Sequence, residues 1–193
     1  MDINTQIASR VQGLRRSLGY SLEALAERSG VSRSMISLIE RGQTSPTAAI
    51  LDKLAAALGV TLAGLFAEAS EEAKIPAPLV RRAEQPVWQD PASGYVRRNV
   101  SPPGFPSSIE LVEVIFPAGQ SVSFDSISRQ PDTHQQIWVL EGAIEITAGE
   151  ESWMLSEGDC LALTLERHIV FRNPGRQQAR YLVALNSQPG KNF

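Results

Sequence analysis

The chain has 193 residues, of which 42% are hydrophobic and 20% are charged, and its formal net charge at pH 7 is −3. This length allows one or two domains with sizeable cores, and the slightly negative charge argues against a dedicated nucleic-acid binder. The single cysteine, Cys160, excludes an intrachain disulfide and a four-cysteine zinc site, and we expect it to be a small buried residue of a strand.

The charge is distributed unevenly along the chain. Residues 1–67 carry seven Lys or Arg against five Asp or Glu, whereas residues 86–193 carry eight against twelve. A mildly basic N-terminal part and an acidic C-terminal part fit a head that contacts DNA and a body that avoids it. The sequence has no basic-then-apolar start and no apolar run approaching ~20 residues, which predicts a cytoplasmic, nucleoid-associated protein that does not enter a membrane.

The first predicted helix covers the start of the chain. Ile3, Ile7, Val11, Leu14 and Leu18 follow one another in steps of four, four, three and four residues. This spacing places all five side chains on one face of an amphipathic helix, which must bury that face against other elements.

A pair of short helices is predicted next, at residues 21–42. A serine N-cap opens the first helix, and Gly30 ends it because glycine tolerates the left-handed conformation at a helix C-terminus. Ser32 caps the second helix, in which Ile36 and Ile39 face the core. The polar residues left on the other sides can donate to base edges and phosphates. Taken alone, the pair fits a packing unit with a solvated outer face equally well.

Two more helices are predicted before residue 67. Ser45 and Pro46 have the residue types of an N-cap and a first helical position, and Gly59 ends the helix that they open. Thr61 then caps a last short turn that carries Phe66. The first 67 residues are therefore predicted to form five helices.

Three motifs in this part resemble the phage-repressor-like, or Xre-type, helix-turn-helix family. They are the A-x(3)-G-V-S core of residues 26–32, the I-x-x-I-E-R-G run of residues 36–42, and the S-P-T of residues 45–47. The resemblance covers residues 3–67 and implies an all-α helix-turn-helix DNA-binding domain at residues 1–67. It also implies double-stranded operator DNA as the partner.

The resemblance assigns roles to the second helix of the pair. It implies base contacts from Arg33, Ser34, Ser37 and Leu38, and backbone contacts from Ser32 and Arg41. Leu38 can offer only an apolar surface, which suits a thymine methyl group. Leu22 stands where the family often has a glutamine that reaches a phosphate, so this contact is missing here.

The composition changes after residue 67. Residues 68–79 mix small, charged and proline residues and are interpreted as a linker. Residues 80–193 contain ten short runs of strand-forming residues, the first at residues 80–84, separated by glycine and proline turns, and this pattern predicts an antiparallel sandwich or barrel.

The second part resembles the cupin family of small β-barrels. The resemblance lies in the runs VLEGAIEIT, SEGDCLAL and FRNPG, and it covers residues 107–187. It implies an all-β, jelly-roll-like barrel at residues 80–193, which would bind an effector in its mouth and pair two chains.

The resemblance also implies that the metal site of the family is absent. Ser128, Gln130, Gln135 and Ile169 occupy the positions at which the family has its histidine and glutamate ligands. None is a competent ligand for a divalent metal. The histidines at positions 134 and 168 lie one residue away, and on a strand this offset turns a side chain to the other face. We therefore expect no metal, no cofactor and no catalytic residues.

A barrel without a metal is interpreted as a binding cup. Ser128, Gln130 and Gln135 would line it, with Phe124 and Phe171 as apolar walls. Amide and hydroxyl groups suit hydrogen bonds to a small polar metabolite.

A basic pair in the second predicted strand of the barrel adds a charge. Arg97 and Arg98 are consecutive, so one of them points inward, and Arg98 is predicted to bind an effector that bears a carboxylate. Alternatively, both lie on the outer surface or in an interface.

These observations favour a dimeric, sequence-specific transcriptional regulator that senses a small molecule through a metal-free cupin barrel and is not an enzyme. Two alternatives remain. One is an antitoxin-like or interaction protein whose β-domain binds another protein, and the other is a metal-dependent cupin enzyme. The effector, the operator and the sign of regulation are not encoded in any motif of the sequence.

Overall fold

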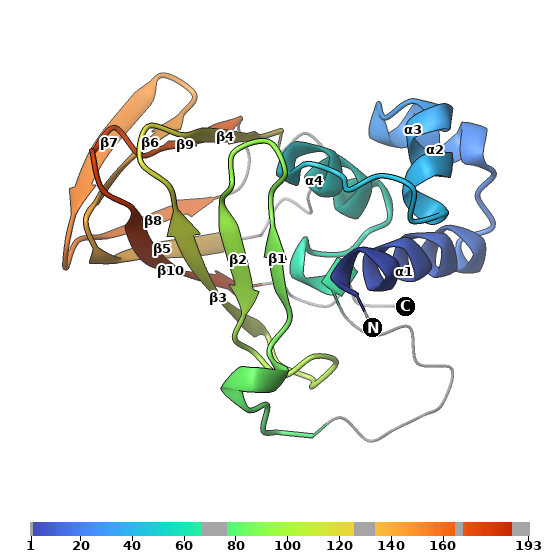
Figure 1. Cartoon of the computed structure of the whole chain (residues 1–193), viewed down its shortest axis with the longest axis horizontal. Helices are drawn as coiled ribbons and strands as arrows, with labels where there is room; N and C mark the ends of the chain where they lie inside the picture. Colours follow the sequence, from blue (N-terminus) through green and yellow to red (C-terminus); the bar gives the residue numbers. More distant parts are fainter. Residues whose placement is uncertain (1, 67–76, 126–133, 165–167, 187–193) are drawn as a thin grey trace.

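The computed structural model describes residues 2–66, 77–125, 134–164 and 168–186, which form a helical head and a β-rich body (Figure 1). The head contains α1 (Ile3–Ser17), α2 (Leu22–Ser29), α3 (Arg33–Glu40), α4 (Ala48–Ala57) and the 3-10 helix η1 (Ala63–Phe66). None of the described helices has the length and apolar character that crossing a membrane requires.

Local signals define the helix ends much as the sequence predicts. The Ser21 hydroxyl accepts a hydrogen bond from the amide of Ala24, and the Ser32 hydroxyl accepts one from the amide of Met35. Gly30 ends α2 in the left-handed conformation, with φ of 66°. These contacts satisfy amide groups that a helix start otherwise leaves without a partner.

Two details of the head differ from the prediction. α4 begins at Ala48 with Thr47 as its N-cap, whose hydroxyl accepts from the amide of Ile50, so the predicted start at Ser45 and Pro46 is wrong. The described part of the head has four α-helices, and the fifth element is the four-residue 3-10 helix η1. The predicted cap of that turn is confirmed, because the amide of Gly64 donates to the Thr61 hydroxyl over 3.0 Å.

The body consists of two antiparallel sheets. The six-stranded sheet has the order β1-β2-β3-β10-β5-β8, and the four-stranded sheet has the order β4-β9-β6-β7. The strands are β1 (Val87–Gln89), β2 (Val96–Asn99), β3 (Ile109–Phe116), β4 (Ser121–Phe124), β5 (His134–Glu141), β6 (Ala143–Ala148), β7 (Glu151–Ser156), β8 (Cys160–Thr164), β9 (Ile169–Arg172) and β10 (Ala179–Asn186).

The inner faces of the two sheets form the core of the body. Buried and less buried residues alternate along β10 and β6, as expected for strands that each present one face to the interior. The rings of Phe171 on β9 and Tyr181 on β10 stack across the two sheets with their centroids 6.0 Å apart. The predicted antiparallel, all-β body is therefore confirmed.

The start of the body differs from the prediction. Residues 80–84 contain the 3-10 helix η2 (Arg82–Glu84) rather than a strand. The Glu84 carboxylate accepts a hydrogen bond from the amide of Arg81, which closes a turn in place of a strand pairing. β1 begins only at Val87.

The head and the body pack directly against each other. The ring of Phe66, in η1, lies 5.9 Å from the ring of Trp88, in β1, and both side chains are buried. The hydrophobic core continues from one part into the other through these rings. We call this contact between η1 and β1 the seam.

Polar contacts elsewhere also join the head to the body. The Thr61 hydroxyl donates to Glu110 over 3.1 Å, and Lys53 on α4 forms an ion pair of 3.1 Å with Asp125. Hydrogen bonds with His168 and Lys53 hold the pKa of the Asp125 carboxyl below its ordinary value. These contacts fix the orientation of α4 relative to the sheets.

A buried aspartate ties the start of α4 to the body. Asp90 is 3% exposed, and its carboxylate accepts from the amide of Ala48, 42 residues earlier, over 2.9 Å. The other carboxylate oxygen accepts from the amide and the hydroxyl of Ser93. A negative charge at the first turn of a helix also interacts favourably with the helix dipole.

We predict that Asp90→Ala lowers the free energy of unfolding by about 2–4 kcal/mol, because three donors then lose a charged acceptor in a buried place. Urea denaturation of the full chain measures this loss. Glu151→Ala, at an exposed site on β7, serves as the control and should change the free energy by less than about 0.5 kcal/mol. Equal effects of the two substitutions would contradict the role of Asp90.

Candidate nucleic-acid interface

The second helix of the pair, α3, presents one apolar and one polar side. Ile36 and Ile39 are buried in the core of the head together with Leu25 of α2. The burial of one face sets the rotation of α3 about its axis, and its other residues therefore face away from the core.

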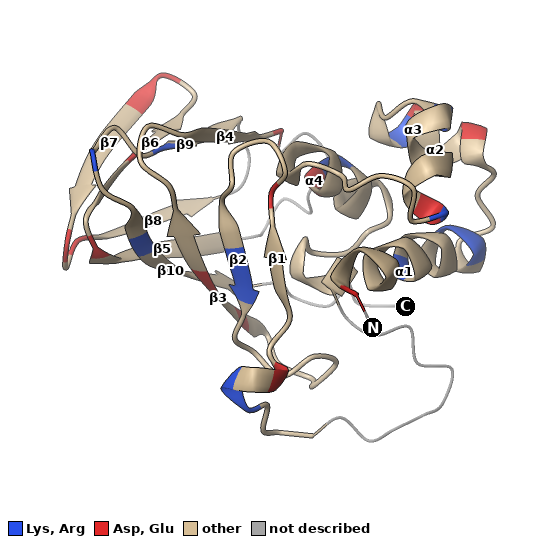
Figure 2. Ribbon diagram, viewed as in Figure 1, with Lys and Arg blue, Asp and Glu red and all other residues tan. Residues whose placement is uncertain are grey.

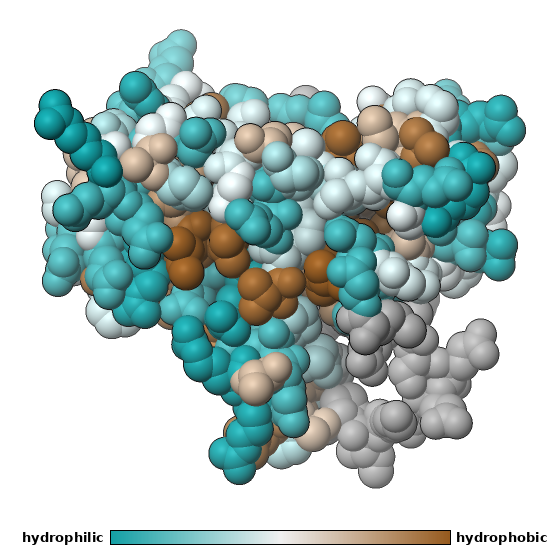
Figure 3. Space-filling view, in the orientation of Figure 1, coloured by the Kyte–Doolittle hydropathy of each residue, from teal (hydrophilic) through white to brown (hydrophobic). Residues whose placement is uncertain are grey.

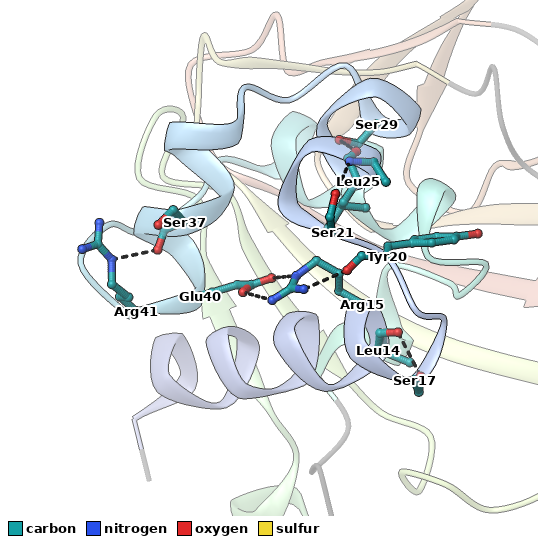
Figure 4. A network of polar contacts seen from close by, with 11 residues as sticks. Leu14, Arg15, Ser17, Tyr20, Ser21, Leu25, Ser29, Ser37, Glu40 and Arg41 are labelled. Carbon is teal, nitrogen blue, oxygen red and sulfur yellow. Dashed lines mark hydrogen bonds and ion pairs between the residues drawn. The ribbon is translucent and has the colours of Figure 1, made fainter.

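An ion pair fixes α3 against α1. The Arg15 guanidinium donates to both Glu40 carboxylate oxygens, over 2.6 and 2.8 Å, and also to the carbonyl of Tyr20 (Figure 4). The two charged side chains are only 12% and 4% exposed. The hydrogen bond with Glu40 raises the pKa of Arg15. Glu40 is thus a structural residue that fixes the end of α3.

The polar residues predicted to contact DNA lie at the start and along the exposed side of α3. Arg33 and Ser34 are exposed, Ser37 and Leu38 are half-buried, and Arg41 is exposed just after the helix. The Arg41 side chain donates to the carbonyl of Ser37 over 3.1 Å, which keeps it beside the helix (Figure 4). The structure thus brings these five residues together on or next to one short helix.

The remaining predicted contact, Ser32, has a structural role as well. Its hydroxyl accepts from the amide of Met35 and lies 3.1 Å from the hydroxyl of Ser34. Because the hydroxyl oxygen already caps α3, its hydrogen is the part that remains for a phosphate.

One charged contact at this surface is not evident from the sequence. The Nε atom of Arg33 lies 2.6 Å from a carboxylate oxygen of Glu23 on α2, and both side chains are about two-thirds exposed, at 65% and 64%. This ion pair orients the Arg33 guanidinium. It is a contact between two helices, so no spacing within either helix could have predicted it.

The predicted effector residues have different outcomes. Ser128 and Gln130 lie outside the described residues. Gln135 is buried on the inner face of β5, and its amide nitrogen has no hydrogen-bond partner among the described residues. Phe124 and Phe171 pack edge-to-face with their centroids 5.8 Å apart, inside the body.

The prediction for Arg98 is wrong. Arg98 pairs with Glu113 across the strands β2 and β3, and its Nε atom lies 3.2 Å from that carboxylate on the outer face of the six-stranded sheet. Arg97 is the inward residue, with 6% of its surface exposed. Adjacent residues of a strand point to opposite faces, and the sequence alone did not show which of the two faces the core.

The side chains of Cys160, Trp138 and His168 lie partly or fully at the surface of the body. Cys160 is exposed at the outer face, so the expectation of a buried strand residue is wrong. Across the strand pairing, Cys160 faces Trp138, which is 48% exposed and points outward. His168 pairs with Asp125 over 2.8 Å. Within the described residues, no group of three or more histidine, cysteine, aspartate or glutamate side chains is arranged to hold a metal ion.

Comparison with known proteins identifies the head. A helix-turn-helix family model matches residues 11–65. An uncharacterised helix-turn-helix transcriptional regulator, y4dJ of Sinorhizobium fredii, is 41% identical over 61 residues, which make up 32% of this chain and 79% of that protein. The chain belongs to the helix-turn-helix family of transcriptional regulators. The resemblance to Xre-type regulators noted in the sequence is thereby confirmed.

Two further similarities cover about a third of the chain and nearly all of it, respectively. SinR of Bacillus subtilis, a helix-turn-helix transcriptional regulator, is 42% identical over 66 residues. That match covers 34% of this chain and spans 60% of the length of SinR, less than two thirds. A helix-turn-helix transcriptional regulator from Vibrio cholerae has a solved structure that superposes with a TM-score of 0.78, at 23% identity, over 97% of this chain and 98% of its own. The fold of head plus body therefore recurs as a unit in that protein.

We predict that Glu40→Ala lowers the free energy of unfolding of the regulator by about 3 kcal/mol, because Arg15 then keeps a largely buried charge without its partner. Glu23→Ala, which removes an exposed carboxylate from the neighbouring helix, is the matched control and should cost much less, because a solvent-exposed ion pair contributes little to stability. Urea denaturation measures both variants. A loss at position 40 no larger than that at position 23 would contradict the role of the ion pair.

Proposed function

We propose that this regulator binds operator DNA as a homodimer, reads bases with α3 and responds to a small polar metabolite in the barrel. The observation that carries the proposal is the exposed polar side of α3, which Arg15 and Glu40 hold in a fixed orientation. Rigid placement of a few donors is what recognition of base edges requires.

Each predicted contact residue in or beside α3 has a specific chemical role in this proposal. Arg33 can donate to the two acceptors of a guanine, Ser34 and Ser37 can pair with several bases, and Leu38 can contact a thymine methyl. Ser32 and Arg41 would contact phosphates, next to the amide groups at the start of α3. Figure 2 shows that α2 and α3 carry both acidic and basic residues, so the head is not uniformly basic. Specific contacts then matter more than general attraction to DNA.

Dimerisation is proposed because a single recognition helix covers one half-site. Half-sites ~34 Å apart require two heads related by a two-fold axis. The outer face of the six-stranded sheet is suited to join two copies. Val87, Ile109 and Trp138 are exposed on this face, and a shallow hollow of about 300 Å³ beside Trp138 is lined by Gln136, Trp138, Cys160, Leu182 and Ala184.

The apolar character of this face is visible on the molecular surface. Figure 3 shows apolar side chains in the middle of the view, over β1, β2 and β3, and others over the helical head at the upper right. A second copy is the partner that fits, because a two-fold dimer places the same apolar patch on both sides of the interface.

The barrel interior is the proposed effector site. Gln135 supports this role, because its buried amide group has no partner among the described residues and can donate to a bound ligand. Ser128 and Gln130 are proposed to assist it. The effector would regulate by binding more tightly to one arrangement of head and body than to another.

DNA recognition is tested with a duplex that the full chain selects from random-sequence DNA. We predict that Arg33→Ala weakens binding to this duplex by about 1–3 kcal/mol and relaxes the base preference, whereas Arg41→Ala weakens binding evenly across sequences. Fluorescence anisotropy at moderate salt measures both effects.

Arg172→Ala removes the same charge from β9, distant in sequence from the head, and serves as the control for net charge. The proposal fails if the variants at positions 33 and 41 bind as tightly as the Arg172 variant does.

The dimer is tested at its proposed centre. We predict that Trp138→Glu converts the chain to a monomer in light scattering, because a charge in an apolar interface lacks a partner, and that duplex affinity falls at least ~tenfold. Met154→Glu is the matched control, because Met154 is 57% exposed on β7 of the other sheet. A Trp138 variant that scatters light as the unchanged chain does would rule out this face as the interface.

A further inference from the structure

The most unusual charged group in the body is the guanidinium of Arg97. It is 6% exposed and lies on the inner face of β2. Its Nη1 atom donates to the hydroxyl of Tyr95 over 3.4 Å, whereas Nε and Nη2 have no hydrogen-bond partner among the described residues. A guanidinium is always charged and carries five N–H donors, so most of its binding capacity is unused.

Two acidic side chains next to Arg97 in the strand pairings are engaged elsewhere. Glu113 lies on the outer face, where it binds Arg98, Arg180 and Arg82. Asp90 is occupied by the start of α4 and by its own turn. A buried charge without a counter-ion is strongly unfavourable, so the described structure has a place for an anion that it does not itself supply.

Neighbouring side chains add further unused polar atoms. Trp88 lies directly opposite Arg97 in the pairing of β1 with β2, and its indole N–H has no partner among the described residues. Asn99, two residues after Arg97 on the same face, has a carbonyl oxygen without a partner there. Three donor atoms and one acceptor atom without partners among the described residues therefore lie on adjacent positions of two short strands.

A second hydroxyl lies close to the guanidinium. Tyr181 is in the same row of the sheet as Arg97, with Val114 between them. Burial raises the pKa of Tyr181 well above its ordinary value, with Tyr95 raising it further and Arg97 lowering it. The hydroxyl therefore keeps its proton and can act as a donor.

We infer that Arg97, with the indole N–H of Trp88 and the hydroxyls of Tyr95 and Tyr181, binds the oxyanion group of a small metabolite. Carboxylate and phosphate share the chemistry that this site recognises, because a guanidinium pairs with two oxygens of either group. The inference rests on the proposed function, since it names the class of effector that the barrel would sense.

The position of this site suits it to transmit the effect of a bound anion to the head. Trp88 packs against Phe66 of η1, and the side-chain amide of Asn99 donates to the carbonyl of Ala63, in the same 3-10 helix, over 3.4 Å. On the other side, Trp88 lies 6.2 Å from the ring of Tyr95. An anion that engages Trp88 therefore acts on a residue that belongs to the seam, and can favour one seating of the head.

The experiment measures thermal unfolding of the full chain in inorganic phosphate, sulfate, acetate and succinate at ~10 mM, each against sodium chloride of equal ionic strength. At least one oxyanion should raise the Tm of the unchanged chain in a saturable way. Arg97→Gln should abolish this shift, and the adjacent outward variant Arg98→Gln should retain it. The inference is overturned if no oxyanion raises the Tm, or if the Arg97 and Arg98 variants respond alike. The rise in Tm caused by phosphate and sulfate is compared with the rise caused by acetate and succinate, which shows which of the two anion classes the site prefers.

A second variant addresses folding. In the absence of oxyanions, Arg97→Met should be at least as stable to urea as the unchanged chain, because it removes an unpaired buried charge and keeps most of the side-chain volume. A clear loss of stability would mean that the guanidinium supports the fold by itself, which contradicts a ligand role.

DNA binding separates the failure of this inference from the failure of the proposed function. The effective oxyanion should alter the duplex affinity of the unchanged chain by about fivefold or more, and should leave the duplex affinity of Arg97→Gln unaltered. An unchanged chain that binds DNA but shows no oxyanion effect on Tm or affinity overturns only the anion site. An unchanged chain that selects no duplex overturns the proposed function.

Discussion

The arrangement of this protein depends on the packing of Phe66 against Trp88. The contact joins the core of a small helical head to the core of the body, so the two parts share one apolar interior. The head extends this contact further, because the Gln6 side chain on α1 donates to the carbonyl of Phe66 over 2.6 Å. Arg15 at the other end of α1 then holds Glu40 of α3. A continuous series of contacts therefore connects the inner face of the sheet to the proposed recognition helix. Spatial continuity of this kind makes coupling feasible, and a binding measurement is what demonstrates it.

The sequence predicted local structure well and contacts between distant segments poorly. Apolar spacing and capping residues are local signals, so the positions of Ile36 and Gly30 followed directly from the pattern. Asp90, in contrast, caps the start of a helix 42 residues away, and its neighbours in the chain give no sign of that partner. The start of α4 was misplaced because Pro46 fits the first helical position, whereas the body supplies a carboxylate at Ala48. Tertiary contacts decided the outcome there.

The barrel shows the limits of strand patterns in a similar way. Consecutive Arg97 and Arg98 guarantee that one arginine faces inward, and the register with β3 decides which one. Cys160 is exposed because its row of the sheet faces outward beside Trp138. The same parity leaves apolar side chains such as Trp138 exposed on the outer face and the charged Arg97 inside. Exposed apolar side chains and a buried charge are both unfavourable in an isolated chain. In our proposals, a second copy would cover the first feature and an anion would neutralise the second. The seam lies between the inner site and the head, so assembly and sensing would act on the same rigid unit.

Site-specific cross-linking tests the central claim, that α3 is the surface which contacts DNA, most directly. A photoreactive group attached through cysteine at position 37, in a chain whose exposed Cys160 is replaced by serine, should cross-link efficiently to the selected duplex. The same group at position 154 on β7, exposed on the body, should not. The predicted result is that the group on α3 cross-links to bases of the duplex and that the group on β7 does not. Equal cross-linking from both positions, or cross-linking from β7 alone, would contradict the account.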